Sequence, residues 1–303
     1  MSLCTILIPT HRHQYLSRSI RYFQQFDFPI VYCDSSDQAW SERLPGNIQY
    51  LHCPKLNFAQ KILFALQKIG TPYVTLCADD DFLNENALHE GLSQLEMKPR
   101  LTAAVGRTLA FDDIEPDKFY QIGSNAPWPE VEGECEDNLK NYMSNYHQIL
   151  WSLFRKDILQ TAMNMVDKAK FENDNFIELV ISTLCAGNGG IAMLDDWWEA
   201  REITTLQQHW GQRNRTISFE YLADSTSKED VSRFLEIIDA ELGVGCGRLV
   251  LGAYAKEAPK GGASFVRKLI SPFIPVCLKR SRLARKRFYV DEKWLRNIRK
   301  VYV

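Results

Sequence analysis

Short apolar runs that alternate with amphipathic helical patterns are the feature that most constrains how this chain folds. The apolar runs have the length of buried strands and lie at residues 5–8, 30–33, 48–51 and 73–77. Two helical patterns, at 16–26 and 59–69, follow the first and third runs. Strands joined through helices form a mainly parallel sheet, because a parallel connection needs a crossover. The sequence therefore predicts an α/β fold whose ligands bind beyond the carboxyl ends of its strands.

Three consecutive aspartates, Asp79, Asp80 and Asp81, directly follow the strand predicted at 73–77. Adjacent carboxylates repel one another and are ionised near neutral pH, so this aspartate run favours a cationic partner. Carboxyl oxygens suit Mg²⁺ or Mn²⁺, and such a cation commonly joins a protein carboxylate to the phosphate oxygens of a substrate. The alternative is that an aspartate caps the following helix, although Asn84 can serve as that cap.

The length and composition of the chain exclude several classes of protein. With 303 residues, it can form one large domain or a domain with an appendage. It has no run of 18 apolar residues and no signal-like N-terminus, so we expect it in the cytoplasm. The eight cysteines include no CxxC pair, which argues against a zinc site and a disulfide framework.

The central part of the chain is divided by a polar segment. Residues 111–145 show no sustained periodicity and predict a substrate-facing loop. Strand-like runs return at 149–154 and 191–194, with a helix predicted at 176–185 between them. These elements extend the α/β pattern.

The C-terminal part is helical and basic. From about residue 221 the apolar spacing is helical, and Ser227 with Asp230 resembles a capping box. Residues 265–303 contain 12 Lys and Arg against 2 acidic residues, whereas the whole chain has a formal charge of −2. We therefore divide the chain into an α/β domain at 1–220 and a helical, basic region at 221–303.

The basic region admits more than one partner. Its apolar stretch with Pro272 and Pro275, followed by a cationic stretch, favours docking on the anionic inner face of the cell membrane. A solvated tail and an oligomer contact explain the same pattern, and the oligomeric state stays open. Nucleic acid is not expected as a partner, because no nucleic-acid-binding motif accompanies the charge.

Four motifs resemble, in order and spacing, those of the family 2 glycosyltransferases of the GT-A fold. They are residues 5–10, Asp34-Ser35-Ser36, the stretch from Asn57 to Gly70, and Ala78-Asp79-Asp80-Asp81. In that family such motifs are the first strand, the base-contacting aspartate, a helix with an early asparagine, and the DxD motif. The resemblance covers residues 3–95 well and 147–210 loosely. It implies a Rossmann-like, mainly parallel sheet flanked by helices, here with a C-terminal helical extension.

The resemblance also implies an activity. It indicates an inverting, metal-dependent enzyme that moves a sugar from a nucleoside diphosphate, UDP above all, to a saccharide or lipid-linked acceptor. Mn²⁺ or Mg²⁺ is the implied cofactor. The implied setting is bacterial cell-surface polysaccharide synthesis.

Residues near the first two strands receive roles toward the nucleotide. The resemblance implies that Pro9 and Thr10 form the turn against it, and that Asn57 and Lys61 of the following helix belong to the same site. Arg12 is the better phosphate partner among the charged residues after the first strand, because a guanidinium group binds phosphate in a fork.

The acidic residues receive roles toward the base, the sugar and the metal. The resemblance implies that Asp34 binds the base, that Asp79 contacts the ribose or sugar, and that Asp81 binds the cation. Asp80 shares either the ribose role or the metal role, because three consecutive aspartates leave the register of the motif open. Asp79 and His209 are the further metal candidates. For Asp34 the alternative is an ordinary turn residue, and for His209 it is a structural or solvated histidine.

A catalytic carboxylate is expected at the start of the helix predicted at 176–185. In the resembling family it follows the DxD motif at about the distance of Asp174 here, often in a Glu-Asp pair, and takes the proton of the acceptor hydroxyl in a single displacement. This chain has Glu172-Asn173-Asp174 instead, so Glu172 and Glu178 stay open as alternatives. Capping of the helix is the other role for Asp174.

Two other functions stay open. A nucleotidyltransferase also combines an α/β sheet with metal-binding acids, but residues 9–13 are a poor match to a glycine-rich phosphate loop. A scaffold protein that binds a nucleotide sugar without catalysis would carry the same donor motifs. Unlike the enzyme, such a scaffold would not need a carboxylate that acts as catalytic base.

Overall fold

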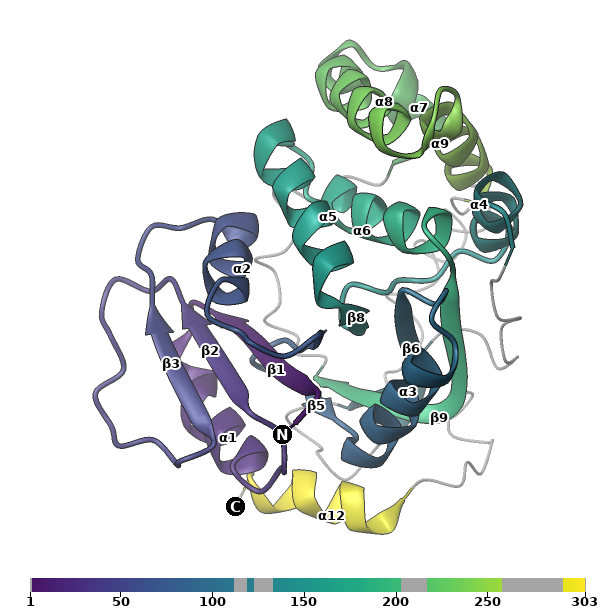
Figure 1. Ribbon diagram of the computed structural model, residues 1–303. Helices are drawn as coiled ribbons and strands as arrows, with labels where there is room; N and C mark the ends of the chain where they lie inside the picture. The colour runs from purple at the N-terminus through teal and green to yellow at the C-terminus, as the bar shows by residue number, and fades with distance from the viewer. Residues whose placement is uncertain (1, 112–118, 123–132, 203–216, 258–290, 303) are drawn as a thin grey trace, which may run out of the picture.

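The structure, a computed structural model, describes residues 2–111, 119–122, 133–202, 217–257 and 291–302. One mixed sheet has the strand order β3-β2-β1-β4-β8-β6-β9-β5, with β7 paired to β6. The strands are β1 Cys4–Thr10, β2 Ile30–Asp34, β3 Ile48–His52, β4 Tyr73–Leu76, β5 Phe82–Leu83, β6 Ala103–Phe111, β7 Phe119–Ile122, β8 Leu153–Arg155 and β9 Ile191–Glu202. Helices flank this sheet (Figure 1).

The first four strands form the parallel half of the sheet, as predicted. β3, β2, β1 and β4 lie side by side, and β1, β2 and β4 are buried throughout. Strands covered on both faces are apolar along their whole length, which explains the continuous apolar runs. Thr10 pairs with Asp34 in the β1–β2 register, and the backbone N–H of Cys77 donates to the carbonyl of Leu7. The ends of β1, β2 and β4 therefore meet at one edge.

The other half adds antiparallel strands to the parallel sheet that the sequence predicts. β8 runs antiparallel between β4 and β6, β6 and β9 are parallel, and β5 and β7 are antiparallel to their neighbours. The backbone N–H of Leu76, at the end of β4, donates to the carbonyl of Ser152, just before β8. β8 therefore begins at the edge where β4 ends, and it runs antiparallel to β4.

β9 is longer than the predicted strand and reaches the aspartate run. Its register with β6 shifts around Gly106. A Cβ atom there would lie 2.5 Å from the backbone oxygen of Asp196, so glycine allows the two backbones to approach this closely. Further along, Ala200 of β9 pairs with Phe82, which directly follows Asp81. The last residues of β9 therefore lie beside the run.

The helices are α1 His13–Phe23, α2 Phe58–Leu66, α3 Glu85–Met97, α4 Cys135–Ser144, α5 Lys156–Ala169, α6 Asn175–Gly187, α7 Phe219–Ala223, α8 Lys228–Leu242, α9 Cys246–Glu257 and α12 Glu292–Lys300. In Figure 1, α5 and α6 lie above β8, with α8 and α9 beyond them. α8 packs against α5 and α6, and α4 packs against α6 and α9. None of the described helices has the length and apolarity that crossing a bilayer requires.

Predictions for single segments have mixed outcomes. Asn84 caps α3, as expected, by accepting the backbone N–H of Asn86. The prediction of a loop at 111–145 is wrong where this segment forms β7 and α4, and its residues 112–118 and 123–132 lie outside the described part of the chain. The elements described after residue 217 are helical, while the domain boundary at 220 stays a prediction.

The predicted capping box at the start of α8 does not form. The Ser227 hydroxyl donates to the carbonyls of Tyr221 and Asp224. The Asp230 carboxylate is 3% exposed and accepts backbone N–H groups from the loop before α6. Each side chain is satisfied by a neighbouring segment, which the local pattern does not reveal.

The C-terminal helix α12 returns to the first elements of the fold. It lies at the bottom of Figure 1, near α1. Trp294 Nε1 donates to the Tyr22 hydroxyl at 2.9 Å and to the carbonyl of Leu83 at 3.1 Å. The Tyr302 hydroxyl donates to Glu202 at the end of β9. Residues from both ends of the described chain therefore meet near the aspartate run.

Candidate active site

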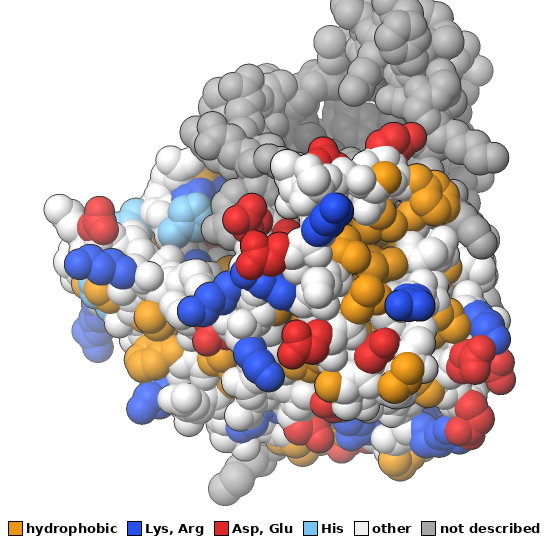
Figure 2. All heavy atoms as spheres, turned by 90° about the horizontal axis from the view of Figure 1, so that it is seen from above, with side chains coloured by type: hydrophobic (Ala, Val, Ile, Leu, Met, Phe, Trp, Pro, Cys, Tyr) orange, Lys and Arg blue, Asp and Glu red, His pale blue; other side chains and the backbone are white. Residues whose placement is uncertain are grey.

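Polar side chains from three strands meet at the carboxyl edge of the parallel half. Thr10 ends β1, Asp34 ends β2, and the aspartate run follows β4. β3 points toward the top of Figure 1, and the view from above in Figure 2 shows acidic and basic side chains next to one another, with histidines to one side. The Thr10 hydroxyl donates to Asp79 Oδ2 at 2.6 Å. Residues far apart in the sequence are thus brought together here.

Asp34 is fully buried and accepts hydrogen bonds on both carboxyl oxygens. Tyr50 donates its hydroxyl at 2.5 Å, and Ser36 donates its backbone N–H at 2.8 Å and its hydroxyl at 2.6 Å. His13 Nε2 lies 2.8 Å from Asp34 Oδ2. Burial pushes the pKa of Asp34 upward, but hydrogen bonds from Ser36, Tyr50 and His13 outweigh it and hold the pKa below its usual value. Asp34 is therefore an ionised acceptor.

Aromatic side chains that the sequence analysis does not single out surround Asp34. Trp40 meets His13 edge to face at 5.7 Å between ring centroids, and Tyr50 stacks with His52 at 6.4 Å. Trp40 Nε1 is buried without a hydrogen-bond partner. Flat rings beside an ionised acceptor suit a nucleobase. Their spacing in the sequence gives no signal, because the β2–β3 pairing and the loop between these strands bring them together.

Three predicted nucleotide residues have roles within the protein. Lys61 is buried, and its ammonium group donates to the carbonyl of Thr10 at 3.0 Å and to the Ser35 hydroxyl at 3.2 Å. Burial lowers the pKa of Lys61. Asn57 caps α2 by accepting a backbone N–H of its first turn, and Pro9 is buried inside β1. Lys61 thus joins the ends of β1 and β2 beneath the site.

Arg12, the predicted phosphate partner, pairs with the aspartate run. Its Nη2 contacts Asp79 and lies 3.1 Å from Asp80 Oδ2. Asp79, Asp80 and Asp81 are all buried. Burial raises the pKa of Asp79, although the charge and hydrogen bond of Arg12 oppose this shift. The arginine therefore compensates the carboxylates only in part.

Asp81 faces the end of β9. Its Oδ1 accepts the backbone N–H of Glu202 at 3.1 Å, and its Oδ2 lies 3.5 Å from Arg201 Nε. Arg201 Nη2 also donates to Glu199 Oε1 at 2.8 Å. Burial, and after it the charge of Asp80, raises the pKa of Asp81 well above its usual value, against the charge of Arg201.

Two buried glutamates of β9 enlarge the acidic cluster. Glu199 accepts from the Thr108 hydroxyl at 3.2 Å, and Glu202 lies 2.6 Å from Arg18 Nη2 and accepts from Tyr302. Burial raises the pKa of both glutamates. The sequence analysis misses them because it ends the strand too early. The available signal is a set of charged residues that directly continues an apolar strand.

The ligand chemistry of this cluster, though not an arrangement of three protein ligands among the described residues, suits a divalent cation such as Mg²⁺ or Mn²⁺. Carboxyl oxygens are the hard ligands that these ions prefer, and Oε2 of Glu199 is buried without a hydrogen-bond partner. The described residues contain no group of three or more His, Cys, Asp and Glu side chains that could hold a metal ion. A cation at Asp81 would therefore take further ligands from a substrate. His209 lies outside the described residues.

The three candidate bases lie at the start of α6. Asp174 is half-buried at the N-cap position and makes no side-chain capping hydrogen bond, and Glu178 lies in the first turn. Glu172 is exposed. The Asp230 carboxylate of α8 accepts the backbone N–H groups of Glu172 at 3.0 Å and of Asn173 at 2.9 Å. The helical region therefore positions the loop that carries the candidates.

Glu178 is linked to the aspartate run through two side chains. It accepts from the Tyr146 hydroxyl at 2.6 Å and from the Gln148 amide. Arg201 Nη1 donates to Gln148 Oε1 at 3.4 Å, and its Nε faces Asp81. Burial raises the pKa of Glu178, and the hydrogen bonds of Tyr146 and Gln148 offset this only in part. Polar contacts therefore connect the start of α6 with the aspartates.

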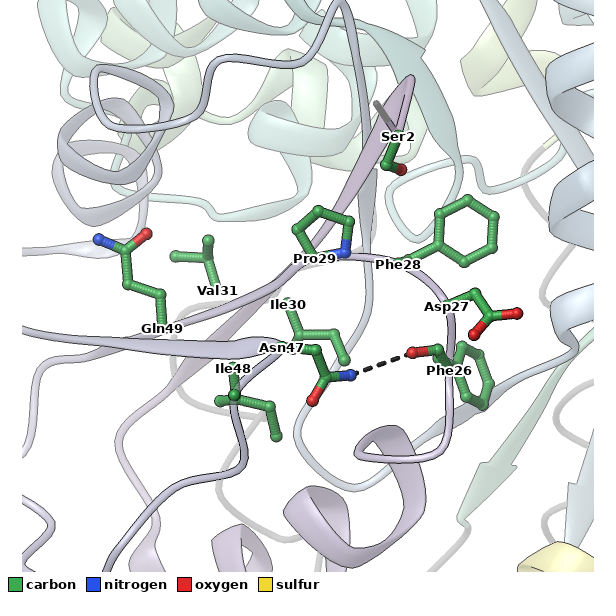
Figure 3. Close-up of a pocket in the computed structure, with 11 residues that line it drawn as sticks. Ser2, Phe26, Asp27, Phe28, Pro29, Ile30, Val31, Asn47, Ile48 and Gln49 are labelled. Carbon is green, nitrogen blue, oxygen red and sulfur yellow. Dashed lines mark hydrogen bonds between the residues drawn. The ribbon is translucent and has the colours of Figure 1, made fainter.

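A cavity of about 560 Å³ lies at the opposite edge of the sheet. Phe28, Ile30 and Asn47 are among its lining residues (Figure 3). The Asn47 amide donates to the carbonyl of Phe26 at 3.0 Å. Because Ile30 begins β2 and Asp34 ends it, the length of a strand separates this cavity from the candidate site.

The fold is similar to that of TarS from S. aureus, a glycosyltransferase. The crystal structure of TarS residues 1–349 with UDP-GlcNAc aligns with 99% of this chain and 90% of that chain, at a TM-score of 0.59 and 14% identity. The crystal structure of the same fragment by itself aligns with 92% of this chain and 77% of that chain, at a TM-score of 0.55 and 10% identity. The crystal structure of the fragment with UDP aligns with 92% of this chain and 77% of that chain, at a TM-score of 0.54 and 12% identity.

This likeness shows that the chain has a fold similar to that of TarS, so the predicted fold class is confirmed. No protein-family model matches the sequence, and no curated protein matches it either. Membership of family 2 in particular stays a prediction.

Asp81→Asn should make the protein more stable at high pH. Burial raises the pKa of Asp81 above its value of about 3.9 in unfolded chains, so its stabilising share is present at low pH and is lost as the pH rises through the raised pKa. Asparagine has nearly the shape of the aspartate side chain but carries no charge. We expect a midpoint temperature about 2–6 °C above that of the native protein near pH 8, and no difference near pH 4.

Thermal unfolding from about pH 4 to pH 8.5 measures this difference. Asp196→Asn is the control, because Asp196 is exposed. A constant difference across the pH range would mean that the charge of Asp81 does not cause the effect.

Proposed function

We propose that this protein transfers a sugar from a UDP sugar to a saccharide or lipid-linked acceptor, with inversion at the anomeric carbon. The observation that carries the proposal is the buried aspartate run at the carboxyl edge of a glycosyltransferase fold, beside Thr10 and near the end of β2. The likeness to TarS structures with UDP and with UDP-GlcNAc supports UDP as the donor nucleotide.

Asp34 is proposed to bind the uracil base. Its ionised carboxylate can accept the ring N–H of uracil in place of a present donor, Tyr50 or His13. Trp40 supports this role, since it offers an aromatic face and a buried N–H without a partner. The site would therefore select a base that presents an N–H donor.

The residues beyond β1 and β4 are proposed to hold the rest of the donor. Arg12 would donate to the diphosphate, and Asp79 and Asp80 would accept from hydroxyl groups of the ribose or the sugar. Asp81, together with Asp79, would hold Mn²⁺ or Mg²⁺, which supplies positive charge to the leaving diphosphate. His209 stays a candidate third ligand.

Asp174 is proposed as the catalytic base. It would take the proton of the acceptor hydroxyl while the hydroxyl oxygen forms a bond to the anomeric carbon and the bond from that carbon to UDP breaks. Glu178, four residues further on the same helical face, is the alternative, because burial raises its pKa and a raised pKa makes a carboxylate a stronger base. Glu172 is less suited, since it is exposed.

Nucleotide binding should depend on the metal and on Asp81. We expect calorimetry to show UDP binding that is tighter than GDP or CDP binding, requires Mn²⁺ or Mg²⁺, and weakens at least about 10-fold in Asp81→Asn. Asp196→Asn should bind UDP normally. If no nucleoside diphosphate binds, the aspartate run is not a donor site and a scaffold function is favoured. Tighter binding of UTP than of UDP would favour nucleotidyl transfer.

Substitution of the three candidate bases should separate catalysis from donor binding. We expect Asp174→Asn to lower kcat about 10²–10⁴-fold with an unchanged Kd for UDP, because it removes the proton acceptor. Glu172→Gln should retain turnover. UDP-GlcNAc is the first donor to assay. If Glu178→Gln loses more kcat than Asp174→Asn, Glu178 is the base. Normal turnover in all three variants would contradict the assignment of Asp174 and that of Glu178.

The basic segment is proposed to dock on an anionic inner membrane surface, where a lipid-linked acceptor would be available. Residues 258–290 contain nine Lys and Arg and no acidic residue. We expect sedimentation with vesicles that contain phosphatidylserine, none with pure phosphatidylcholine, and release at high salt. A variant with glutamine at the six basic positions of 279–287 should stay in solution. Equal binding to neutral vesicles would contradict an electrostatic contact.

A further inference from the structure

Arg201 lies between the aspartate run and the side chains that contact Glu178. Its three nitrogen atoms reach three different groups. Nε lies 3.5 Å from Asp81 Oδ2, Nη2 lies 2.8 Å from Glu199 Oε1, and Nη1 lies 3.4 Å from Gln148 Oε1. Its side chain is 27% exposed. The guanidinium group can therefore meet a ligand without any movement of the backbone of β9.

The hydrogen bonding around the aspartate run is incomplete. Nε of Arg201 faces Asp81 at 3.5 Å without making a hydrogen bond, and Nε of Arg12 and Nε of Arg18 also lack an acceptor. Oε2 of Glu199 is a buried acceptor without a donor, while Nε of Arg107 and Nε of Arg299 lack acceptors elsewhere in the described residues. Glu199 is 2% exposed. Such atoms are rare in proteins because they have lost their water without replacement. Arg12, Arg18, Arg201 and Glu199 belong to contacts at the aspartate run and the end of β9, so a ligand that enters there could satisfy these atoms.

Arginines and carboxylates of this region are in direct contact. Arg201 lies against the buried carboxylates of Asp81 and Glu199, and Arg12 lies against those of Asp79 and Asp80. A divalent cation at Asp81 would compete with Arg201 for this carboxylate. A diphosphate would then give the guanidinium group of Arg201 new acceptors.

We infer that Arg201 is a diphosphate-binding residue of the donor site, which exchanges Asp81 and Glu199 for the diphosphate when a divalent cation neutralises those carboxylates. This inference rests on the proposed function. The guanidinium group of Arg201 competes with the divalent cation for Asp81, and it attracts the diphosphate. Binding of the metal therefore releases Arg201 for UDP, and binding of UDP draws Arg201 away from the metal ligand, so each favours the binding of the other. The exchange also loosens the contact of Arg201 with Gln148, which links donor binding to Glu178.

The substitution Arg201→Gln should change metal binding and nucleotide binding in opposite directions. We expect its affinity for Mn²⁺ alone, measured by electron paramagnetic resonance of free Mn²⁺, to rise about 3–10-fold, because a competing charge is gone. Its affinity for UDP at saturating Mn²⁺ should fall about 10–100-fold. Its affinity for uridine, which has no phosphate, should stay within about 2-fold.

Two variants control for structural damage. Arg201→Lys keeps the positive charge without the fork, so it should bind Mn²⁺ like the native protein and UDP with intermediate affinity. Arg107→Gln removes an arginine from the neighbouring strand β6 that pairs with Asp195 instead of the aspartate run, and both affinities should stay unchanged. A rise in Mn²⁺ affinity cannot result from unfolding, so this measurement keeps the test decisive even if Arg201→Gln is less stable.

Several outcomes would overturn the inference. Unchanged UDP affinity in Arg201→Gln would mean that the arginine does not bind the diphosphate. A parallel loss of affinity for Mn²⁺, UDP and uridine would give Arg201 a purely structural role. If the native protein binds no nucleoside diphosphate, the proposed function fails as well, whereas normal native binding with an unaffected variant refutes the role of Arg201 alone.

Discussion

The burial of several negative charges at one edge of the sheet is the constraint on which the rest of the site depends. Asp79, Asp80 and Asp81 lose most of their water there, and α1 and β9 bring arginines against them. Burial raises the pKa of Asp79 and of Asp81, while the charges of Arg12 and Arg201 act in the opposite direction. The proposed cation and the phosphates of the proposed donor would bind at this edge, because carboxyl oxygens are the ligands that Mg²⁺ and Mn²⁺ prefer.

The second half of the fold places the groups that would act on an acceptor. The close approach of β9 to Gly106 and its pairing with β5 carry Arg201 to the aspartate run, and Gln148 continues the contacts to Glu178. The carboxylate of Asp230 in α8 fixes the loop before α6 from the other side. The C-terminal helical region is therefore part of the architecture of the site, whatever its boundary in the sequence.

The likeness to TarS at 10–14% identity concerns the path of the backbone. A shared fold places an edge where ligands bind, while the side chains at that edge decide the chemistry. In this chain the proposed nucleobase site consists of Asp34, Tyr50 and Trp40, and the proposed phosphate site consists of arginines that contact acidic residues. The proposed activity therefore depends on these contacts, and the experiments address them directly.

The sequence by itself determined the parallel half of the sheet and the place of Thr10, Asp34 and the aspartate run at its edge, because buried parallel strands have continuous apolar runs and turns follow them directly. The resemblance to family 2 glycosyltransferases predicts a catalytic base at the start of α6, and this stays a prediction. Only the tertiary structure decided the antiparallel strands, the inward glutamates of β9, the link through Arg201 and the role of Asp230. Those features depend on strand register and helix packing between segments distant in the chain, which periodicity within one segment does not encode.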